Sequence, residues 1–565
     1  MVGRSELCPR QGMEFVSIDT MLPSPDISAL SGYSKVRPRK TRFRLMTRLA
    51  AVACVLASAL LAACGSLPPQ PERSASYALS PSAESPLARI ARDSASTPSL
   101  TGFRLMPEAY YALDVRIELV RRARYSLDVQ YYLIQNDRSG RLLMRSLRNA
   151  ALRGVRVRLL VDDLTTVGGD PMFHGLAAFP NVDVRLFNPF CCARGSLASR
   201  FAASLGDFER LNHRMHNKLF IADGAMAVMG GRNIADEYFA RSAGKNFVDM
   251  DVLVVGSVVP QLEAIFDTYW NSDQAYPINA ILGDSPDGEE ARQNFNHLVD
   301  DGDQMMSVTM RPLDMLGQPP IVTELDAGRL ELIWGTANAF SDQPRKVMAT
   351  SIEQARSMSV QMNVMDRLAE SKREVVISSP YFVPGTEGVQ AFADLRQRGV
   401  SVVILTNSLA ATDVPAVHIG YSRYRVALLR TGVKLYELRP SGVQRDELAL
   451  VPHASFGSLH AKAAVIDESM VYLGSMNLDP RSDSTNTELG IFARCPELAR
   501  EVARVIDMSR QESSYEVEFA PGGENLQWLQ VGTKPEVTLR SEPEVTPFME
   551  FRTLLFAPFV PEQLL

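Results

Sequence analysis

The stretch His216-Asn217-Lys218-Leu219-Phe220-Ile221-Ala222-Asp223 returns later in the chain as His460-Ala461-Lys462-Ala463-Ala464-Val465-Ile466-Asp467. Each stretch is followed at the same distance by a short segment that ends in asparagine, Gly230-Gly231-Arg232-Asn233 and Gly474-Ser475-Met476-Asn477. Residues i and i+2 of a β-strand point to the same face of the sheet. Each copy is therefore expected to direct one imidazole and one ammonium group into a common space, and its glycine lets the backbone approach a ligand.

The sequence upstream of the two copies is also repeated. Residues 125–132 and 374–382 are rich in aromatic and β-branched side chains and predict a strand, and residues 154–161 and 399–405 predict a second strand in each pass. The residues between these strands carry apolar side chains at helical spacing, so each pass has the order strand, helix, strand. This order favours parallel pairing within an α/β sheet.

Matching distances indicate that the whole unit is duplicated. His216 lies 62 positions after Gly154, and His460 lies 61 positions after Gly399. We therefore predict an α/β fold made of two similar halves related by a pseudo-twofold axis. Each half should contain a mixed or parallel sheet flanked by helices, and the functional site should lie in the seam between the halves.

Composition divides the chain into five predicted parts. Residues 1–63 form an N-terminal extension with a signal peptide, and the Pro- and Ser-rich residues 64–100 form a tether. Residues 101–345 form the first half, and the last part of this range has no counterpart in the second half and is interpreted as a helical insertion or bridge. Residues 346–520 form the second half. Residues 521–565 form a C-terminal tail whose apolar end either docks on the body or contacts lipid.

The long apolar run from Leu49 to Ala63 contains 15 residues and follows a basic flank. A helix that spans a membrane needs about 20 apolar residues, so a secretory signal is the better interpretation. The run closes with Leu61-Ala62-Ala63-Cys64-Gly65, which resembles the lipobox of bacterial lipoproteins. This resemblance implies lipidation of Cys64 and a lipid-anchored protein of the bacterial cell envelope that faces the periplasm, on the inner or the outer membrane. The alternative is an ordinary signal peptide with a chance cysteine.

The distribution of charge argues against a nucleic-acid partner. The whole chain has a formal charge of −6, but residues 1–63 contain nine Lys or Arg and four Asp or Glu, which leaves 50 basic and 61 acidic side chains and a net charge of −11 on the remainder. An acidic body without a basic run lacks the electrostatic footprint of a protein that binds nucleic acid.

The sequence indicates neither a metal site nor a cofactor. His213 and His216 have a spacing that could hold a metal, but Lys218 beside them disfavours a cation, and no further ligands are near in sequence. Cys191-Cys192 and Cys495 form no disulfide or metal pattern. We expect buried thiols, and one bridge to Cys495 is left open.

The repeated side chains suit the chemistry of a phosphodiester. Ammonium and carboxamide groups can hold the non-bridging oxygens and stabilise the charge that grows in the transition state. One neutral imidazole can attack phosphorus, while a protonated one donates to the departing alcohol. The residues in these roles are His216, His460, Lys218, Lys462, Asn233 and Asn477.

The doubled pattern resembles the HKD signature of the phospholipase D superfamily, and both copies are intact. The likeness covers about residues 102–519. Finer features are similar to the cardiolipin synthases, most of all those of the C type, such as Val184-Arg185-Leu186-Phe187-Asn188-Pro189-Phe190, Tyr269-Trp270-Asn271-Ser272 and Pro561-Glu562-Gln563-Leu564-Leu565. The resemblance implies a two-step exchange through a phosphatidyl-histidine, in which a phosphatidyl group passes to phosphatidylglycerol and glycerol or ethanolamine is released.

The family pattern also implies roles for the acidic residues. The motif assigns Asp223 and Asp467 to the catalytic set, but both are expected to act structurally, by bonding near the turn that follows each strand. Each histidine of the family is oriented by an acid further downstream, and the matching positions are Asp249 and Glu488. His216 is favoured as the nucleophile over His460, which then serves as acid and base, although a pseudo-symmetric site lets either histidine serve.

The leading prediction is an enzyme that makes cardiolipin from phosphatidylglycerol and a second phospholipid, either phosphatidylglycerol or phosphatidylethanolamine. A phospholipase D, in which water replaces the acceptor lipid, is the first alternative. A nuclease is disfavoured by the acidic charge, and a catalytically dead lipid-binding lipoprotein is disfavoured by two complete motifs. The sequence identifies no accessory protein and leaves the oligomeric state open.

Overall fold

The computed structural model describes residues 67–95, 97–284, 287–300, 310–441, 457–523, 525–533 and 537–562, without the side chains of Leu205, Leu554, Phe556 and Phe559. The predicted signal peptide and Cys64 lie outside these residues. Within the described part, no helix is long and apolar enough to cross a membrane.

The sheet of the first half is mixed. Its β2–β3 and β3–β4 pairs are parallel, and the remaining neighbours are antiparallel. The strand order is β1 (Thr101–Met106), β8 (Asp251–Gly256), β6 (Met226–Gly230), β5 (Leu219–Ala222), β2 (Ser126–Tyr131), β3 (Arg156–Asp162), β4 (Val182–Phe187) and β9 (Ala275–Pro277).

The sheet of the second half repeats this arrangement. Its parallel pairs are β11–β12 and β12–β13, and its other neighbours are antiparallel. The strand order is β10 (Ile333–Ser341), β17 (Leu489–Arg494), β16 (Met470–Gly474), β15 (Ala463–Ile466), β11 (Glu374–Ser378), β12 (Ser401–Asn407), β13 (Lys434–Leu438), β18 (Ser514–Phe519), β19 (Leu526–Gln530) and β20 (Val537–Leu539).

The matching strand orders confirm the prediction of two similar α/β halves. The predicted strand–helix–strand units form β2, α4 (Arg138–Leu152) and β3 in one half, and β11, α14 (Gly385–Gln397) and β12 in the other. Strands β5 and β15, which follow the two His-x-Lys segments, pair antiparallel to β2 and β11. The sheets are therefore mixed, with the parallel strands on one side of each histidine motif.

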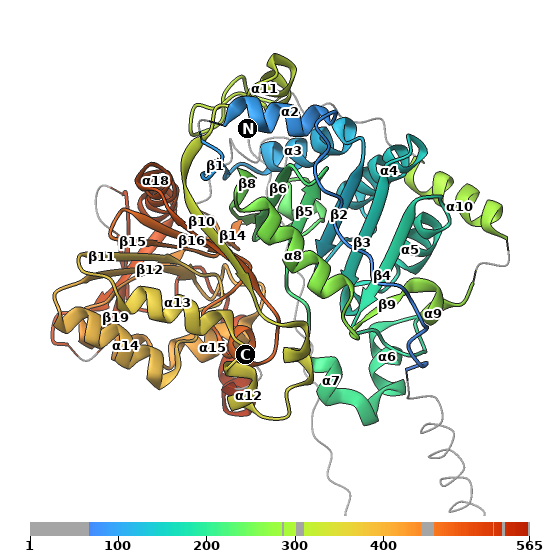
Figure 1. The fold of residues 1–565 in the computed structure, drawn as a ribbon. Coiled ribbons are helices and arrows are strands. Elements are labelled where there is room, and N and C mark those ends of the chain that lie inside the picture. The colour runs from blue at the N-terminus through green and yellow to red at the C-terminus, as the bar shows by residue number, and fades with distance from the viewer. Residues whose placement is uncertain are drawn as a thin grey trace, which may run out of the picture. The chain divides into compact units, whose positions relative to one another are not determined.

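The insertion between the halves joins the two sheets. Strand β10 pairs with β1 through residues 333–335 and with β17 through residues 336–341, and it runs between the halves in Figure 1. The short strands β7 (Asn246–Val248) and β14 (Gly457–Leu459), one from each half, also pair with each other, in parallel. The predicted bridge is thus partly helical and partly a shared strand. Its helices are α9 (Ile278–Leu282), α10 (Gly288–Asp300) and α11 (Ile321–Ala327).

Three apolar cores hold the helices and sheets together. One covers the outer face of the first sheet with α3 (Ala109–Arg122), α4 and α5 (Asp170–Ala177), and another covers the outer face of the second sheet with α13 (Val360–Ala369), α14 and α16 (Arg425–Thr431). The third core contains residues of both inner faces together with α8 (Val259–Trp270) and α18 (Pro496–Glu512). This shared core fixes the halves against each other, as the seam site requires.

The ends of the described chain are more ordered than predicted. The segment predicted to be a tether instead bonds to the first half: the Ala78 amide donates to Asp267, and α2 (Pro86–Ser94) buries Leu87 and Ile90 in the core. The predicted tail supplies strands β19 and β20 to the second sheet. Cys495 is buried as expected, whereas Cys191 and Cys192 are half-buried, with sulfur atoms 2.7 Å apart.

Candidate active site

Each His-x-Lys segment is extended backbone immediately before its strand, rather than part of it. His216 and Lys218 precede β5, and His460 and Lys462 precede β15. The backbone of each histidine is held by the opposite half: the His216 amide donates to the Thr487 carbonyl at 2.8 Å, and the His460 amide donates to the Val248 carbonyl at 2.7 Å. The seam therefore positions both imidazoles.

The carboxylates that orient the imidazoles are exchanged between the halves. Glu488 of the second half lies 3.0 Å from Nδ1 of His216 in the first. Asp249 of the first half lies 2.7 Å from Nδ1 of His460 in the second. Sequence order suggested that each histidine pairs with the acid downstream of it in its own half, and the structure corrects this to a crossed arrangement. Neither half contains a complete histidine–carboxylate pair.

The two glycine segments differ at the position after the first glycine, where each residue contacts one of these carboxylates. Gly231 packs against the short Asp249 side chain, and a Cβ at this position would lie 2.1 Å from Oδ1 of the carboxylate. Ser475, its counterpart, donates its hydroxyl to the longer Glu488 side chain at 2.5 Å. The residue after the first glycine is thus matched to the length of the acid beside it.

Burial favours the neutral form of both imidazoles. It lowers the pKa of His216 to about 4, against the opposing effect of Glu488. Burial also lowers the pKa of His460 well below its usual value, and the ammonium groups of Lys462 and Lys218 add to this effect. A neutral imidazole with Nδ1 beside a carboxylate has its Nε2 lone pair available for attack on phosphorus.

The two lysines lie behind the histidines and are almost fully buried. Each ammonium group donates to the carbonyl of the histidine two residues before it, at 2.6 Å in both copies. Burial lowers the pKa of Lys462 to about 8 and that of Lys218 well below its ordinary value, while Glu488 and Asp249 oppose these shifts. A bound phosphodiester anion would stabilise the charged form of both side chains.

The histidines and asparagines meet in one cavity. It has a volume of about 540 Å³ and is lined by His216, His460, Asn233 and Asn477 together with residues of both halves. The Asn233 amide donates to the Tyr238 hydroxyl at 2.8 Å, and the side-chain oxygens of both asparagines are buried without a hydrogen-bond partner. These two oxygens are acceptors, so they can take hydrogen bonds from hydroxyl or ammonium groups of a polar ligand.

The cavity also contains residues that sequence reasoning missed. Tyr132 and Tyr238 contact the edges of His216 and His460, with ring centroids 5.1 Å apart in each pair. Tyr381 and Arg481 lie in the same wall, and the Tyr381 hydroxyl donates to Asp413 at 2.6 Å. Tyr132 follows β2 and Tyr381 follows β11, so their equivalent positions in the repeat could have identified them as residues of the site. Asp413 lies in a loop and Arg481 in the short helix α17 (Pro480–Ser484), and neither belongs to the repeated pattern.

The motif aspartates bond to backbone amides outside the cavity. Asp223 accepts hydrogen bonds from the amides of residues 124–126 and from the Ser85 hydroxyl. Asp467 accepts from the amides of residues 372–374. Each carboxylate therefore fixes the start of β2 or β11 to the turn after the motif strand, and neither lines the cavity.

Asp223→Asn is therefore expected to destabilise the fold while the chemistry is retained. The buried amide would leave at least one backbone N–H without a good acceptor, which costs about 2 kcal/mol. Asp467→Asn is the matched control, because its site is partly exposed and water can replace lost bonds. Urea unfolding should show the larger loss for Asp223→Asn, and kcat of the folded fraction should change less than about three-fold. A large fall in kcat at unchanged stability would place Asp223 in catalysis.

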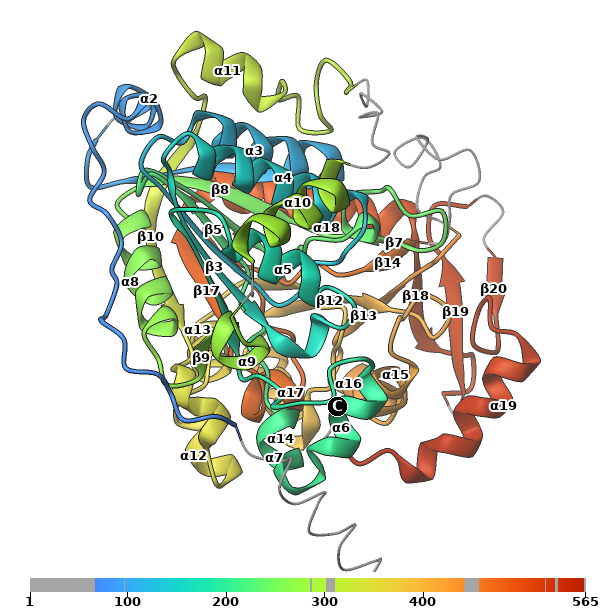
Figure 2. The same ribbon diagram turned by 90° about the vertical axis from the view of Figure 1, so that its right-hand side faces the viewer.

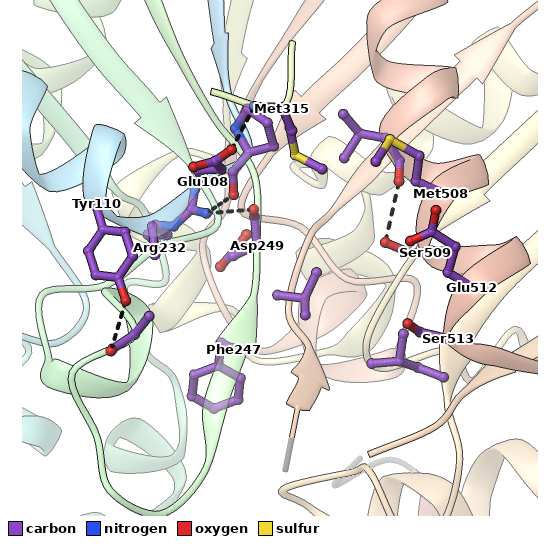
Figure 3. A pocket seen from close by; sticks show the side chains of 16 residues that line it. Glu108, Tyr110, Arg232, Phe247, Asp249, Met315, Met508, Ser509, Glu512 and Ser513 are labelled. Atoms are coloured by element: carbon purple, nitrogen blue, oxygen red, sulfur yellow. Dashed lines mark hydrogen bonds between the residues drawn. The ribbon is translucent and has the colours of Figure 1, made fainter. Parts of the chain in front are cut away.

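A second, smaller cavity makes the two half-sites unequal. It lies between the halves, has a volume of about 100 Å³, and is lined by Asp249, Arg232 and Phe247 from one side and by the end of α18 from the other (Figure 3). Asp249 forms part of its wall while its bonding partner His460 faces the main cavity. Glu488 lines neither of these cavities.

Within the described residues, no group of three or more His, Cys, Asp and Glu side chains is placed to hold a metal ion. The positive charges nearest the histidines are instead the ammonium groups of Lys218 and Lys462.

The crossed pairing predicts which histidine each carboxylate controls. In Glu488→Gln, the new amide can donate to Nδ1 of His216, which moves the ring proton to Nε2 and removes the lone pair needed for attack. Comparable changes reduce turnover by about 10²- to 10⁴-fold. Nitrogen NMR of the seven histidines should show an altered tautomer of His216 in Glu488→Gln and of His460 in Asp249→Asn. The opposite assignment would show that the pairs are not crossed.

Two duplicated α/β halves that share one cavity and two His-x-Lys pairs define an enzyme of the phospholipase D superfamily. The family described as "Cardiolipin synthase, PLD-like domain" matches residues 117–270 and 364–509. These two segments cover more than half of the chain and contain both motifs, so the chain belongs to this family. The resemblance seen in the sequence is thereby confirmed.

Individual relatives agree with the family. The chain is 38% identical to cardiolipin synthase C of Escherichia coli K12 over 79% of its own length and 92% of that protein. It is 24% identical to a cardiolipin synthase of Staphylococcus aureus Mu50 over 69% of its length and 63% of that protein. The crystal structure of a phosphatidylserine synthase from Haemophilus influenzae Rd KW20 covers 85% of this chain and all of its own, with a TM-score of 0.52 and 14% identity. At this identity the last comparison establishes the fold alone.

Proposed function

We propose that the protein makes cardiolipin by passing a phosphatidyl group from one phospholipid to a hydroxyl group of phosphatidylglycerol. The observation that carries this proposal is the single cavity in which both histidines meet, each paired with a carboxylate of the other half. The likeness to a protein named cardiolipin synthase C supports the choice of reaction.

In the first step, Nε2 of His216 attacks phosphorus, and the bond from phosphorus to the head-group oxygen breaks. Protonated His460 donates its proton to that oxygen, so the head-group alcohol leaves neutral and a phosphatidyl-histidine remains. The substrate anion raises the pKa of His460 from its low value in the empty site. Lys218, Lys462 and the two asparagines hold the non-bridging oxygens.

In the second step, neutral His460 takes the proton of a phosphatidylglycerol hydroxyl as its oxygen attacks phosphorus. The phosphorus–nitrogen bond breaks and returns His216 to its neutral form, so no net proton is consumed. The donor is phosphatidylglycerol or phosphatidylethanolamine, and the matching product is glycerol or ethanolamine. Asp413 and Arg481 in the cavity wall offer charges of both signs to a head group.

Product analysis tests this proposal directly. The purified full-length protein is incubated with phosphatidylglycerol vesicles, with and without phosphatidylethanolamine, and the lipids are resolved by mass spectrometry. Cardiolipin with a stoichiometric head-group alcohol is expected, and His460→Ala is the inactive control. Phosphatidic acid as the main product would instead establish hydrolysis by water, the activity of a phospholipase D.

We further propose that the mature chain is a lipoprotein anchored through Cys64 and facing the periplasm. This proposal is supported by the sequence around Cys64 alone. Cys64→Ser, expressed in a host that processes lipoproteins, should lose its acyl chains and leave the washed membrane fraction at least in part. Mass spectrometry of the N-terminal peptide checks this result. Acyl chains retained on the variant would refute the assignment.

A further inference from the structure

Helix α19 (Pro547–Phe556) carries an apolar stripe that faces away from the protein. Phe548, Phe551 and Leu555 lie at positions i, i+3 and i+7, which form one face of a helix. Their exposed fractions are 73%, 64% and 52%. A helix of a soluble body normally buries such a stripe, so this one is arranged to contact something outside the fold.

The stripe belongs to a helix whose end is fixed beside the main cavity. The Arg423 guanidinium donates at 3.0 Å to the carbonyls of Ala557 and Val560, and the Tyr424 hydroxyl donates to the Glu562 carboxylate at 2.6 Å. Val560 packs against a small apolar cluster of Val383 and Val417, and Val417 of α15 (Pro415–Ser422) lines the cavity that contains both histidines. These hydrogen bonds and this packing hold the C-terminal end of α19 near the cavity.

A second apolar element borders the cavity from the other half. Phe208, which begins α7 (Phe208–Asn212), lines the cavity and is 52% exposed, and Leu197 at the start of α6 (Leu197–Ala203) is 43% exposed. Figure 2 shows α6, α7, α15 and α19 along the same lower side. Phe208, Phe548 and Phe551 are the phenylalanines that the described part of the chain leaves most exposed.

We propose that α19, together with the α6–α7 segment, docks on the surface of a phospholipid bilayer and so presents the cavity to its lipid substrate. This inference rests on the proposed function, because a lipid-embedded substrate exposes its phosphodiester only at the bilayer surface. Side chains of phenylalanine and leucine partition into the boundary between head groups and acyl chains. Arg552, one turn after Phe548 and exposed, adds a cation suited to anionic head groups.

Depth-dependent fluorescence tests the docking without any turnover. Phe551→Trp and, as the matched control, Leu152→Trp are prepared in the full-length protein; Leu152 is 66% exposed at the end of α4. The probe is a vesicle of phosphatidylglycerol and phosphatidylethanolamine with brominated acyl chains, and the fluorescence of the unsubstituted protein is subtracted. The vesicles should quench the fluorescence of the new tryptophan in Phe551→Trp and leave that of Leu152→Trp unchanged. Equal quenching in both variants, or none in Phe551→Trp, would overturn the proposal.

A second experiment links the docking to catalysis. The triple variant Phe548→Ser/Phe551→Ser/Leu555→Ser should lower the ratio of the rate on vesicles to the rate on monomeric short-chain phosphatidylglycerol by about ten-fold or more. An unchanged ratio would contradict docking. A second contradicting result would be a concentration-dependent dimer that the triple variant abolishes, together with no quenching of Phe551→Trp by vesicles. If vesicles quench Phe551→Trp but the protein forms no lipid product, the proposed function fails and the docking surface stands.

Discussion

Replacing His216 or His460 by alanine is expected to remove nearly all turnover, by about 10⁴-fold or more for each single variant. The reaction needs a neutral imidazole and a protonated one at the same moment, on opposite sides of one phosphorus. Because the two groups act as one unit, the double variant should be scarcely slower than either single variant. Initial rates of cardiolipin formation by the three variants measure this non-additivity.

The pH dependence of the wild-type enzyme provides a second measurement of the same coupling. Turnover should fall at low pH as the nucleophile His216, whose pKa burial lowers to about 4, takes up a proton. It should fall at high pH as the acid loses its proton, so the profile is bell-shaped and its limbs belong to the pair. Half of the wild-type rate surviving in either histidine variant would show two independent sites and contradict the shared cavity.

Removal of either buried ammonium group should cause the second largest loss. Lys218→Met and Lys462→Met keep the volume of the side chain but remove the charge next to the phosphorus oxygens. Loss of one donor in a site that excludes water costs about 10²- to 10³-fold in kcat. Because the same groups stabilise a five-coordinate phosphorus, the affinity for orthovanadate should fall with kcat.

Lys346→Met is the matched control for the lysine variants. Lys346 is also fully buried, but its ammonium group is bonded to Asp342 and the Ser482 carbonyl rather than to the carbonyl of His216 or His460. Its removal should lower the free energy of unfolding with a smaller effect on vanadate affinity. Equal vanadate affinity in Lys218→Met and the wild type would show that Lys218 does not contact the phosphate.

Most of the fold follows from local patterns in the sequence. The β-branched and aromatic residues around Val129 and Val157, and again around Val376 and Val403, are enough to place the central parallel strands. The offsets of the two motifs, 62 and 61 positions, indicate the duplication. The shared strand β10 is not evident, because it has no counterpart in the other half and its pairing partners, β1 and β17, are far apart in sequence.

The sequence likewise reveals some residues of the candidate site and not others. The histidines, lysines and asparagines are identified by the repeat, since each pair occupies equivalent positions in the two halves. The crossing of Asp249 and Glu488 depends on how the halves pack, and sequence order within one half cannot reveal it. The hydrogen-bond donors to Asp223 are amides at the start of β2, far earlier in the chain, so the turn that follows its own strand does not reveal them.

The central claim is a covalent phosphatidyl-histidine formed at one shared site. Phosphatidylglycerol labelled with radioactive phosphorus is mixed with the full-length enzyme, the reaction is quenched with alkali or organic solvent that spares phosphorus–nitrogen bonds, and the peptides are sequenced by mass spectrometry. The account predicts label on His216 of the wild-type enzyme and none in His216→Ala. Continued cardiolipin formation with no phosphorus on any histidine would contradict it.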